Sequence, residues 1–218
     1  MVVLDVLRAT TTMIAALAAG CDEIRVFAEV EATRAAATGH PGPRLLCGER
    51  QAQPPAGFDL GNSPGDFTHE RCAGRTLFMT TTNGTPTIMA AVRAPRVLIG
   101  AVANRSAVAR QLVAEGRDAT ILCAGQRGDL ALEDLLGAGA ILSALTTTVD
   151  LHNDASWMSL ELFQRHAAQL GATFRRCLGA RTELRLGLDQ DIDYCAVPDR
   201  WDVIGVLNNL AAIRRLQD

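Results

Sequence analysis

The chain has 218 residues, of which 48% are hydrophobic and 4% aromatic, and its formal net charge at pH 7 is -3. This length and hydrophobic content suffice for one large core, so we predict a single α/β domain over residues 1–218. A nucleic-acid partner is not expected, because the chain lacks a basic excess. No run of about 18 apolar residues is present, so no membrane span or membrane partner is expected either.

All 21 residues counted as Lys or Arg are Arg. The absence of Lys excludes a Walker A lysine, a Schiff-base lysine and a lysine general base. Any anion site must therefore use Arg, backbone N–H groups or a metal ion. The six Cys residues show neither a C-x-x-C motif nor paired Cys-His spacing, so we interpret them as reduced thiols of a cytoplasmic protein.

The first stretch of the chain predicts a buried strand over residues 2–6 and a helix over residues 10–19. Open α/β sheets bind ligands at the carboxyl ends of their strands, so the polar residues after this strand are candidates for a site. A threonine at a helix start is also a common cap, and an aspartate at a strand end is often a turn residue. These candidates are Asp5, Arg8, Thr10, Thr11 and Thr12.

Two further apolar strands, residues 77–80 and 121–124, also end in polar, glycine-containing loops. Three strand ends of this type predict one shared pocket. A fourth strand, residues 44–47, delivers Glu49 and Arg50, which could add a carboxylate and an anion-binding fork or form a structural ion pair. The candidates from the two loops and the helix that follows are Thr82, Asn83, Gly84, Thr85, Arg127, Glu133 and Asp134.

The order of strands and helices predicts a three-layer α/β/α fold with a largely parallel or mixed sheet. A strand, a Thr-rich turn, an Ala-rich helix and a second strand occur at residues 2–27 and again at 77–99. Either two similar halves or ordinary βαβ connections would produce this echo. Residues 48–75 are irregular and rich in Gly and Pro, which favours a lid or pocket wall.

The last third of the chain gives fewer signals. We expect a helix over residues 156–170, a solvated acidic helix start at 189–195, a strand over 203–207 and a terminal helix over 210–216. The Ala-rich helices, together with a Gly-containing helix over residues 133–145, lead us to expect a homodimer.

The residues at the strand ends combine hard carboxylate oxygens with arginines. Carboxylates without His or Cys suit Mg²⁺, which takes one or two of them together with substrate phosphate. Arginine forks and helix N-terminal amides suit an oxyanion. The combination predicts a metal-dependent reaction on a small phosphorylated acid. No G-x-G-x-x-G follows any predicted strand, which argues against a dinucleotide-binding oxidoreductase.

Several rare strings along the chain resemble the 2-phosphosulfolactate phosphatase family. The match runs in order from the first residues to about residue 145, and more loosely beyond. The family's pattern carries a further segment ahead of the first strand, whereas this chain begins four residues before Asp5. The strings are DVLRATTT (5–12), GER (48–50), GFDLGNSP (57–64), TTNGT (81–85), CAG (123–125), LED (132–134) and GAG (137–139).

The resemblance implies a Mg²⁺-dependent phosphatase that hydrolyses (R)-2-phospho-3-sulfolactate to 3-sulfolactate and phosphate, a step of coenzyme M biosynthesis. The partner would be a small phosphorylated and sulfonated organic acid. Two alternatives stay open: a phosphatase for another small 2-phospho-carboxylic acid, or a non-catalytic module that binds an anionic metabolite.

Asp5 has two candidate roles, as a metal ligand or as the nucleophile of an aspartyl-phosphate. Aspartyl phosphatases of the haloacid-dehalogenase type carry a second Asp two residues later and a Lys, whereas this chain has Leu7 and no Lys. We therefore favour metal ligation. The predicted catalytic residues are Asp5, Arg8, Asn83 and Glu133. The predicted metal ligands are Asp5, Glu133 and Asp134. The predicted substrate-binding residues are Arg8, Thr10, Thr11, Thr12, Arg50, Thr82, Asn83, Gly84, Thr85 and Arg127.

Overall fold

The computed structural model describes residues 1–145 and 149–217, and within them eight strands form one mixed sheet. The strands are β1 (Val2–Leu4), β2 (Glu23–Phe27), β3 (Arg44–Gly48), β4 (Thr76–Thr80), β5 (Val97–Gly100), β6 (Ile121–Cys123), β7 (Gly205–Leu207) and β8 (Ala212–Arg215). Their spatial order is β3-β4-β2-β8-β7-β5-β1-β6.

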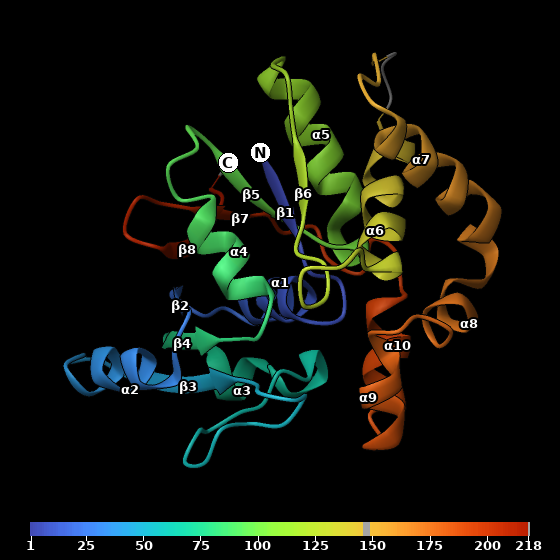
Figure 1. Cartoon of the computed structure of the whole chain (residues 1–218). Helices are drawn as coiled ribbons and strands as arrows, with labels where there is room; N and C mark the ends of the chain where they lie inside the picture. Colours follow the sequence, from blue (N-terminus) through green and yellow to red (C-terminus); the bar gives the residue numbers. More distant parts are fainter. Residues whose placement is uncertain (146–148, 218) are drawn as a thin grey trace.

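The sheet consists of two parallel groups separated by an antiparallel hairpin. The first group is β3-β4-β2, the second is β5-β1-β6, and β7 and β8 lie between them. The two groups run in opposite senses along the sheet because three antiparallel pairings separate them. Strand twist accumulates across the sheet, so the groups lie crosswise in Figure 1. The mixed α/β sheet predicted from the sequence is confirmed.

Helices cover both faces of the sheet, as the predicted three-layer fold requires. α1 and α4 pack against each other on one face, while α2 lies against β3 and β4 on the other face and α5 and α6 lie near β5, β1 and β6 (Figure 1). The helices are α1 (Ala9–Ala18), α2 (Val30–Thr38), α3 (His69–Cys72), α4 (Gly84–Ala90), α5 (Arg105–Glu115), α6 (Leu132–Ser143), α7 (Asp154–His166), α8 (Leu170–Phe174), α9 (Ala180–Arg185) and α10 (Asp189–Cys195).

Side-chain alternation along β1 explains how one short strand serves two cores. Val3 belongs to the cluster that α1 completes with Met13 and Leu17. Val2 and Leu4 point to the opposite face, into the cluster formed with α5 and α6. Because successive side chains of a strand point to opposite faces, all three residues of β1 are buried. This anchors the residue that follows the strand, Asp5.

The two parallel groups have corresponding topologies. β1 is the central strand of its group and β4 is the central strand of the other. The connection β1-α1-β2 crosses from the second group to the first, and β4-α4-β5 crosses back. The stretches 2–27 and 77–99, in which the sequence showed an echo, thus occupy equivalent places. A duplication would produce this arrangement, and its occurrence stays a prediction.

The predicted terminal helix over residues 210–216 is wrong, because this segment contains β8. The side-chain oxygen of Asn208 accepts the backbone N–H groups of Leu210 (2.8 Å) and Ala212 (3.1 Å), which closes a tight turn after β7. Ile213 then pairs with Ile24 of β2. The hairpin fills the space between the two parallel groups, and this long-range pairing outweighs the local helical pattern.

All six cysteines are free, as the sequence predicted, and Cys47 and Cys123 lie in β3 and β6. Among the helices of the described part of the chain, none has the length and apolar character needed to cross a membrane.

Candidate active site

A cavity of about 350 Å³ opens where the ends of β1, β3, β4 and β6 approach the first turn of α6 and helix α9. The three strand ends singled out in the sequence all contribute to its lining, and so do residues 49–52 and 62 of the segment 48–75. The prediction that this segment is irregular is wrong for its last part, which forms a 3-10 turn at Pro64–Asp66 and helix α3. Five acidic side chains line it: Asp5, Glu49, Glu133, Asp134 and Glu183. Three arginines line it: Arg8, Arg50 and Arg127.

Asp5 lies at the floor of the site, directly after β1. Its Oδ1 accepts the backbone N–H of Ala9 (3.1 Å). Its Oδ2 faces the α-carbon of Gly84, and a methyl group on that carbon would come within 2.7 Å of Oδ2. Burial raises the pKa of Asp5 to about 7; the Ala9 N–H opposes the shift, and the charges of Glu49 and Glu133 add to it. Asp5 is therefore an unusually basic carboxylate.

Asp134 links two strand ends. Its Oδ1 accepts the backbone N–H of Val6 (2.8 Å), and its Oδ2 accepts that of Gly125 (3.0 Å). Burial, and then the charge of Asp5, raises the pKa of Asp134 well above its usual value. Both oxygens are engaged by the backbone, so Asp134 holds the loops after β1 and β6 together.

Glu133 and Glu183 are different, because each has one oxygen without a partner. Glu133 is 4% exposed and Glu183 7% exposed, and within residues 1–145 and 149–217 the Oε2 atom of each accepts no hydrogen bond. Burial raises the pKa of both carboxyls. Oε1 of Glu183 lies 3.8 Å from Nε of Arg8. These two buried oxygens are free to receive a cation or a proton.

Glu49 closes the cavity from the side of β3. Its carboxylate accepts the backbone N–H (2.7 Å) and the hydroxyl (3.2 Å) of Thr82, and the backbone N–H of Ala52 (3.0 Å). Thr82, a predicted substrate-binding residue, does line the cavity. Its backbone N–H and its hydroxyl both donate to Glu49.

Arg8 joins four segments of the chain. Its guanidinium contacts Asp191 of α10, donates to Ser63 Oγ (3.2 Å) and the Ala52 carbonyl (3.2 Å), and faces Glu183. It is 3% exposed. Asp191 itself is buried and also accepts a hydrogen bond from Ser63 (2.7 Å), so the expectation of a solvated acidic helix start at 189–195 is wrong at this position.

Arg50 is also engaged within the protein. It donates to the carbonyls of Glu49 (2.7 Å) and Ala28 (2.7 Å) and to the Thr80 hydroxyl (2.9 Å). Arg50 lines the cavity, and these bonds fix its guanidinium beside the end of β4.

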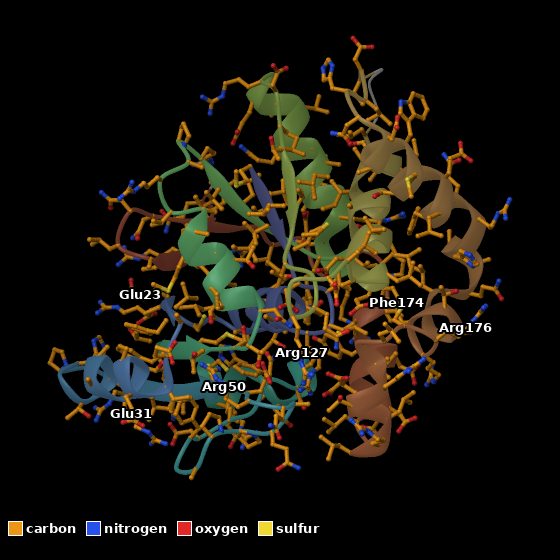
Figure 2. The ribbon with its side chains drawn as sticks, in the orientation of Figure 1. Glu23, Glu31, Arg50, Arg127, Phe174 and Arg176 are labelled. Carbon is orange, nitrogen blue, oxygen red and sulfur yellow. The ribbon has the colours of Figure 1, made fainter. Side chains whose placement is uncertain are left out.

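Arg127 contrasts with the other two arginines. Its side chain is exposed and has no hydrogen-bond or ion-pair partner in the part of the chain described, while its backbone N–H donates to Oδ1 of Asn83 (3.3 Å). Figure 2 labels Arg50 and Arg127, which both line the cavity. The cavity therefore has one guanidinium available to an anion and one nearby amide, that of Asn83.

Two matching turns carry residues into the cavity. Gln51 and Ala52 have positive φ and are closed by the pairing of Arg50 with Gln53. Arg127 and Gly128, after β6, also have positive φ, and they are closed by the pairing of Gln126 with Asp129. The first turn follows β3, the third strand of the stretch β1-α1-β2-α2-β3, and the second follows β6, the third strand of the stretch β4-α4-β5-α5-β6. The correspondence between these two stretches therefore extends to the site.

Four predicted substrate-binding hydroxyls lie outside the cavity lining, and each bonds within the protein. Thr10 donates to the Asp5 carbonyl (2.9 Å), Thr11 to that of Val6 (2.8 Å), Thr12 to that of Asn62 (2.9 Å) and Thr85 to that of Thr81 (3.1 Å). All four are fully buried. They shape the loops after β1 and β4. Gly84 is likewise outside the lining and acts by its close approach to Asp5.

The sequence patterns missed two acids that contact Arg8. Glu183 and Asp191 stand on helices more than 170 residues from Arg8 along the chain, and no motif marks them. Only the tertiary fold brings them to Arg8, and Glu183 also lines the cavity.

The donor set fits Mg²⁺ in chemistry. Among the described residues, no three or more His, Cys, Asp or Glu side chains are arranged as a ready ligand cluster. Mg²⁺ needs only one or two carboxylates, with water and substrate phosphate completing its octahedron. Asp5, Glu133 and Glu183 supply carboxylates, and two of them have a buried oxygen without a partner.

Comparison with known proteins identifies the class. A sequence model of the family described as 2-phosphosulpholactate phosphatase matches residues 1–209. A probable 2-phosphosulfolactate phosphatase from Synechococcus sp. (strain JA-3-3Ab) is 40% identical over 209 residues, covering 93% of this chain and 86% of the relative. One from Caldanaerobacter subterraneus subsp. tengcongensis is 36% identical over 219 residues, covering 100% and 90%.

The family match and the names of these relatives define the chain as an enzyme of the phosphoric monoester hydrolase class, and its α/β fold with a polar cavity at the strand ends agrees with this class. The chain belongs to the 2-phosphosulfolactate phosphatase family, as the sequence motifs indicated.

Proposed function

We propose that the chain is a Mg²⁺-dependent phosphatase that hydrolyses (R)-2-phospho-3-sulfolactate to 3-sulfolactate and phosphate, the type of reaction that serves coenzyme M biosynthesis. The observation that carries this proposal is the match of the family across residues 1–209, combined with a cavity built from the family-like motifs. The names of the relatives suggest the substrate.

The charge of the cavity supports a role for a divalent cation. The substrate carries a phosphate, a carboxylate and a sulfonate, yet five acids and three arginines line the cavity. Arg8 is paired with Asp191, and Arg50 is bonded to two carbonyls and a hydroxyl. Without added positive charge, a polyanion would be repelled from these carboxylates. A bound Mg²⁺ would neutralise charge on the phosphoryl group and polarise water.

The chain's own residues then divide the work. Arg127, with its unengaged guanidinium, is suited to bind one acidic group of the substrate, and the side chain of Asn83 lies beside it. Asp5 and Glu133 provide carboxylates at the reacting phosphate, with Asp134 positioning the loops around them. Most of the rate enhancement in phosphoryl transfer comes from such positioning and charge neutralisation.

Asp5 retains two candidate roles in this scheme. Its raised pKa and exposure to the cavity suit a metal ligand or a base for water, and a carboxylate in the same place could attack phosphorus directly. Acid quenching during turnover of a substrate labelled with ³²P separates the two: a covalent phospho-enzyme that disappears in Asp5→Asn supports the nucleophile, and its absence supports metal ligation.

The experiment that tests the proposed substrate compares kcat/KM for 2-phospho-3-sulfolactate, 2-phospholactate and phosphoglycolate with Mg²⁺ present. We expect the sulfonated compound to be preferred. Preference for either of the other two compounds would support the alternative that the chain is a phosphatase of another 2-phospho-carboxylic acid. Thermal stabilisation by these compounds without phosphate release from any of them would support the alternative that the chain is a non-catalytic binding module.

A further inference from the structure

We propose that Glu183 of α9, together with Glu133 of α6, binds the divalent cation of the cavity. This inference rests on the proposed function and adds a ligand that the sequence motifs did not contain. Both side chains line the cavity, both are more than nine-tenths buried, and each has an Oε2 atom without a hydrogen-bond partner in the described residues.

A buried carboxylate oxygen without a partner carries a free-energy cost that a proton or a cation can remove. The chain has no Lys to supply an ammonium group. The Arg8 guanidinium is already bonded to Asp191, and its Nε lies 3.8 Å from Oε1 of Glu183, too far for a close ion pair.

The backbone of α9 brings the two carboxylates to the same place. Oε1 of Glu133 lies against Gly179, where a methyl group would come within 2.0 Å. Gly179 is the residue immediately before α9, has helical backbone angles (φ -54°, ψ -44°) and precedes Glu183 by four residues. Residues four apart in helical backbone lie on the same face. Glu133 and Glu183 therefore reach one face of α9, on the wall of the cavity.

Asp134, the neighbouring acid, provides the contrast. Its two oxygens each accept a backbone N–H, at 2.8 and 3.0 Å. Asp134 thus holds two loops together, whereas Glu133 and Glu183 each have one oxygen that accepts no hydrogen bond from the described residues. Two carboxylates with water and substrate phosphate are a sufficient set for Mg²⁺.

The test uses Mn²⁺ as a paramagnetic substitute for Mg²⁺, bound to the full chain without substrate and followed by electron paramagnetic resonance. We expect Glu183→Gln to weaken Mn²⁺ binding by about tenfold or more, which is the scale of losing a metal-supporting group. Glu183→Asp, which keeps the charge but is one methylene shorter, should bind with intermediate affinity and serves if the Gln variant does not fold.

Two further variants complete the design. Glu161→Gln removes an exposed acid of α7 and should bind Mn²⁺ as the wild type does. Asp191→Asn releases Arg8 without changing an acid that lines the cavity, so it should affect Mn²⁺ binding less than Glu183→Gln. Equal Mn²⁺ affinity in wild type and folded Glu183 variants would overturn the proposal, as would an Asp191→Asn effect as large as that of Glu183→Gln.

Mn²⁺ binding is measured without substrate, so this experiment tests the cation site separately from the proposed phosphatase function. Glu183-dependent Mn²⁺ binding in a protein that hydrolyses none of the three phosphorylated acids would keep the cation site and remove the proposed function. Turnover of the sulfonated substrate with unchanged Mn²⁺ affinity in the Glu183 variants would do the reverse.

Discussion

The carboxylate of Glu133 packs directly onto the α-carbon of Gly179, so that a methyl group there would come within 2.0 Å of Oε1. Glycine at this position lets α9 approach α6 closely enough to enclose the cavity. The contact makes the placement of Glu133 depend on a residue that carries no functional group.

Gly179→Ala should therefore displace the Glu133 carboxylate and lower kcat/KM by about 10²-fold, the cost of a displacement of roughly 1 Å in an active site. The matched control is Gly65→Ala, because a methyl group at Gly65 would meet no atom within 4 Å. Steady-state kinetics of both variants check the prediction. Normal kinetics in folded Gly179→Ala would show that the position of Glu133 is not critical.

Arg127 and Arg8, two arginines of the cavity, should respond differently to truncation. Arg127→Ala should raise KM about tenfold through the loss of an anion contact, with no loss of thermal stability, because its guanidinium bonds to none of the described residues. Kinetics and thermal unfolding together check this, and an unchanged KM would remove Arg127 from substrate binding.

Arg8→Ala should chiefly reduce stability, by about 3–5 kcal/mol, because it leaves Asp191 buried without its cation. Urea unfolding measures this loss. A variant as stable as the wild type, with only KM altered, would show that Arg8 is mainly a substrate ligand, as the sequence motif suggested.

Asp5→Asn should lower kcat by at least about 10²-fold with the fold retained, since an Asn side-chain oxygen still accepts the Ala9 N–H. Phosphate-release kinetics and circular dichroism check both parts. Asp22→Asn, an exposed acid nearby in sequence, is the control. Near-normal turnover in Asp5→Asn would remove Asp5 from the mechanism.

An ion pair outside the cavity lining joins β2 to β8 and tests how much the β7–β8 hairpin contributes to stability. Glu23 of β2 accepts bonds from Arg25 (2.6 Å) and from Arg214 of β8 (2.9 and 2.7 Å). Burial opposes ionisation, but these arginines lower the pKa of Glu23 below its usual 4.5. Its stabilisation is therefore present above pH 4.5 and lost as the pH falls through the lower folded value.

Glu23→Gln should cost about 1–2 kcal/mol at pH 7, and the difference from wild type should shrink as the pH falls below about 4. Urea unfolding over this pH range gives the answer. Glu31→Gln is the control, because its contact with Arg34 is highly exposed and should contribute little. Figure 2 labels Glu23 and Glu31 away from the centre of the view. A Glu23→Gln difference that does not vary with pH would contradict the assignment.

Local patterns were sufficient for the framework of this protein. The strands that carry Asp5, Asn83 and Arg127 were recognisable because apolar runs ended in polar, Gly-rich loops, and the structure brings these ends to one cavity. The Asn208 turn and β8 were missed because the strand is stabilised by pairing with β2, almost 190 residues away. Glu183 and Asp191 were missed for a similar reason, since helices α9 and α10 acquire their roles only by packing around Arg8.

The hydroxyls of Thr10, Thr11, Thr12 and Thr85 show the limit of motif reasoning. A Thr-rich turn after a strand serves an anion site or a capping role equally well in sequence. Here each hydroxyl bonds to a backbone carbonyl inside the protein. These threonines identify in the sequence the loops that form the site, although their side chains lie outside the cavity lining.

The most direct measurement is phosphate release from 2-phospho-3-sulfolactate by the wild type and by Asp5→Asn, each with Mg²⁺ and with EDTA. The account predicts release that requires Mg²⁺ in the wild type and is lost in Asp5→Asn. Release that persists in EDTA would contradict the metal-dependent site, and absence of release from the folded wild type with Mg²⁺ would contradict the proposed reaction itself.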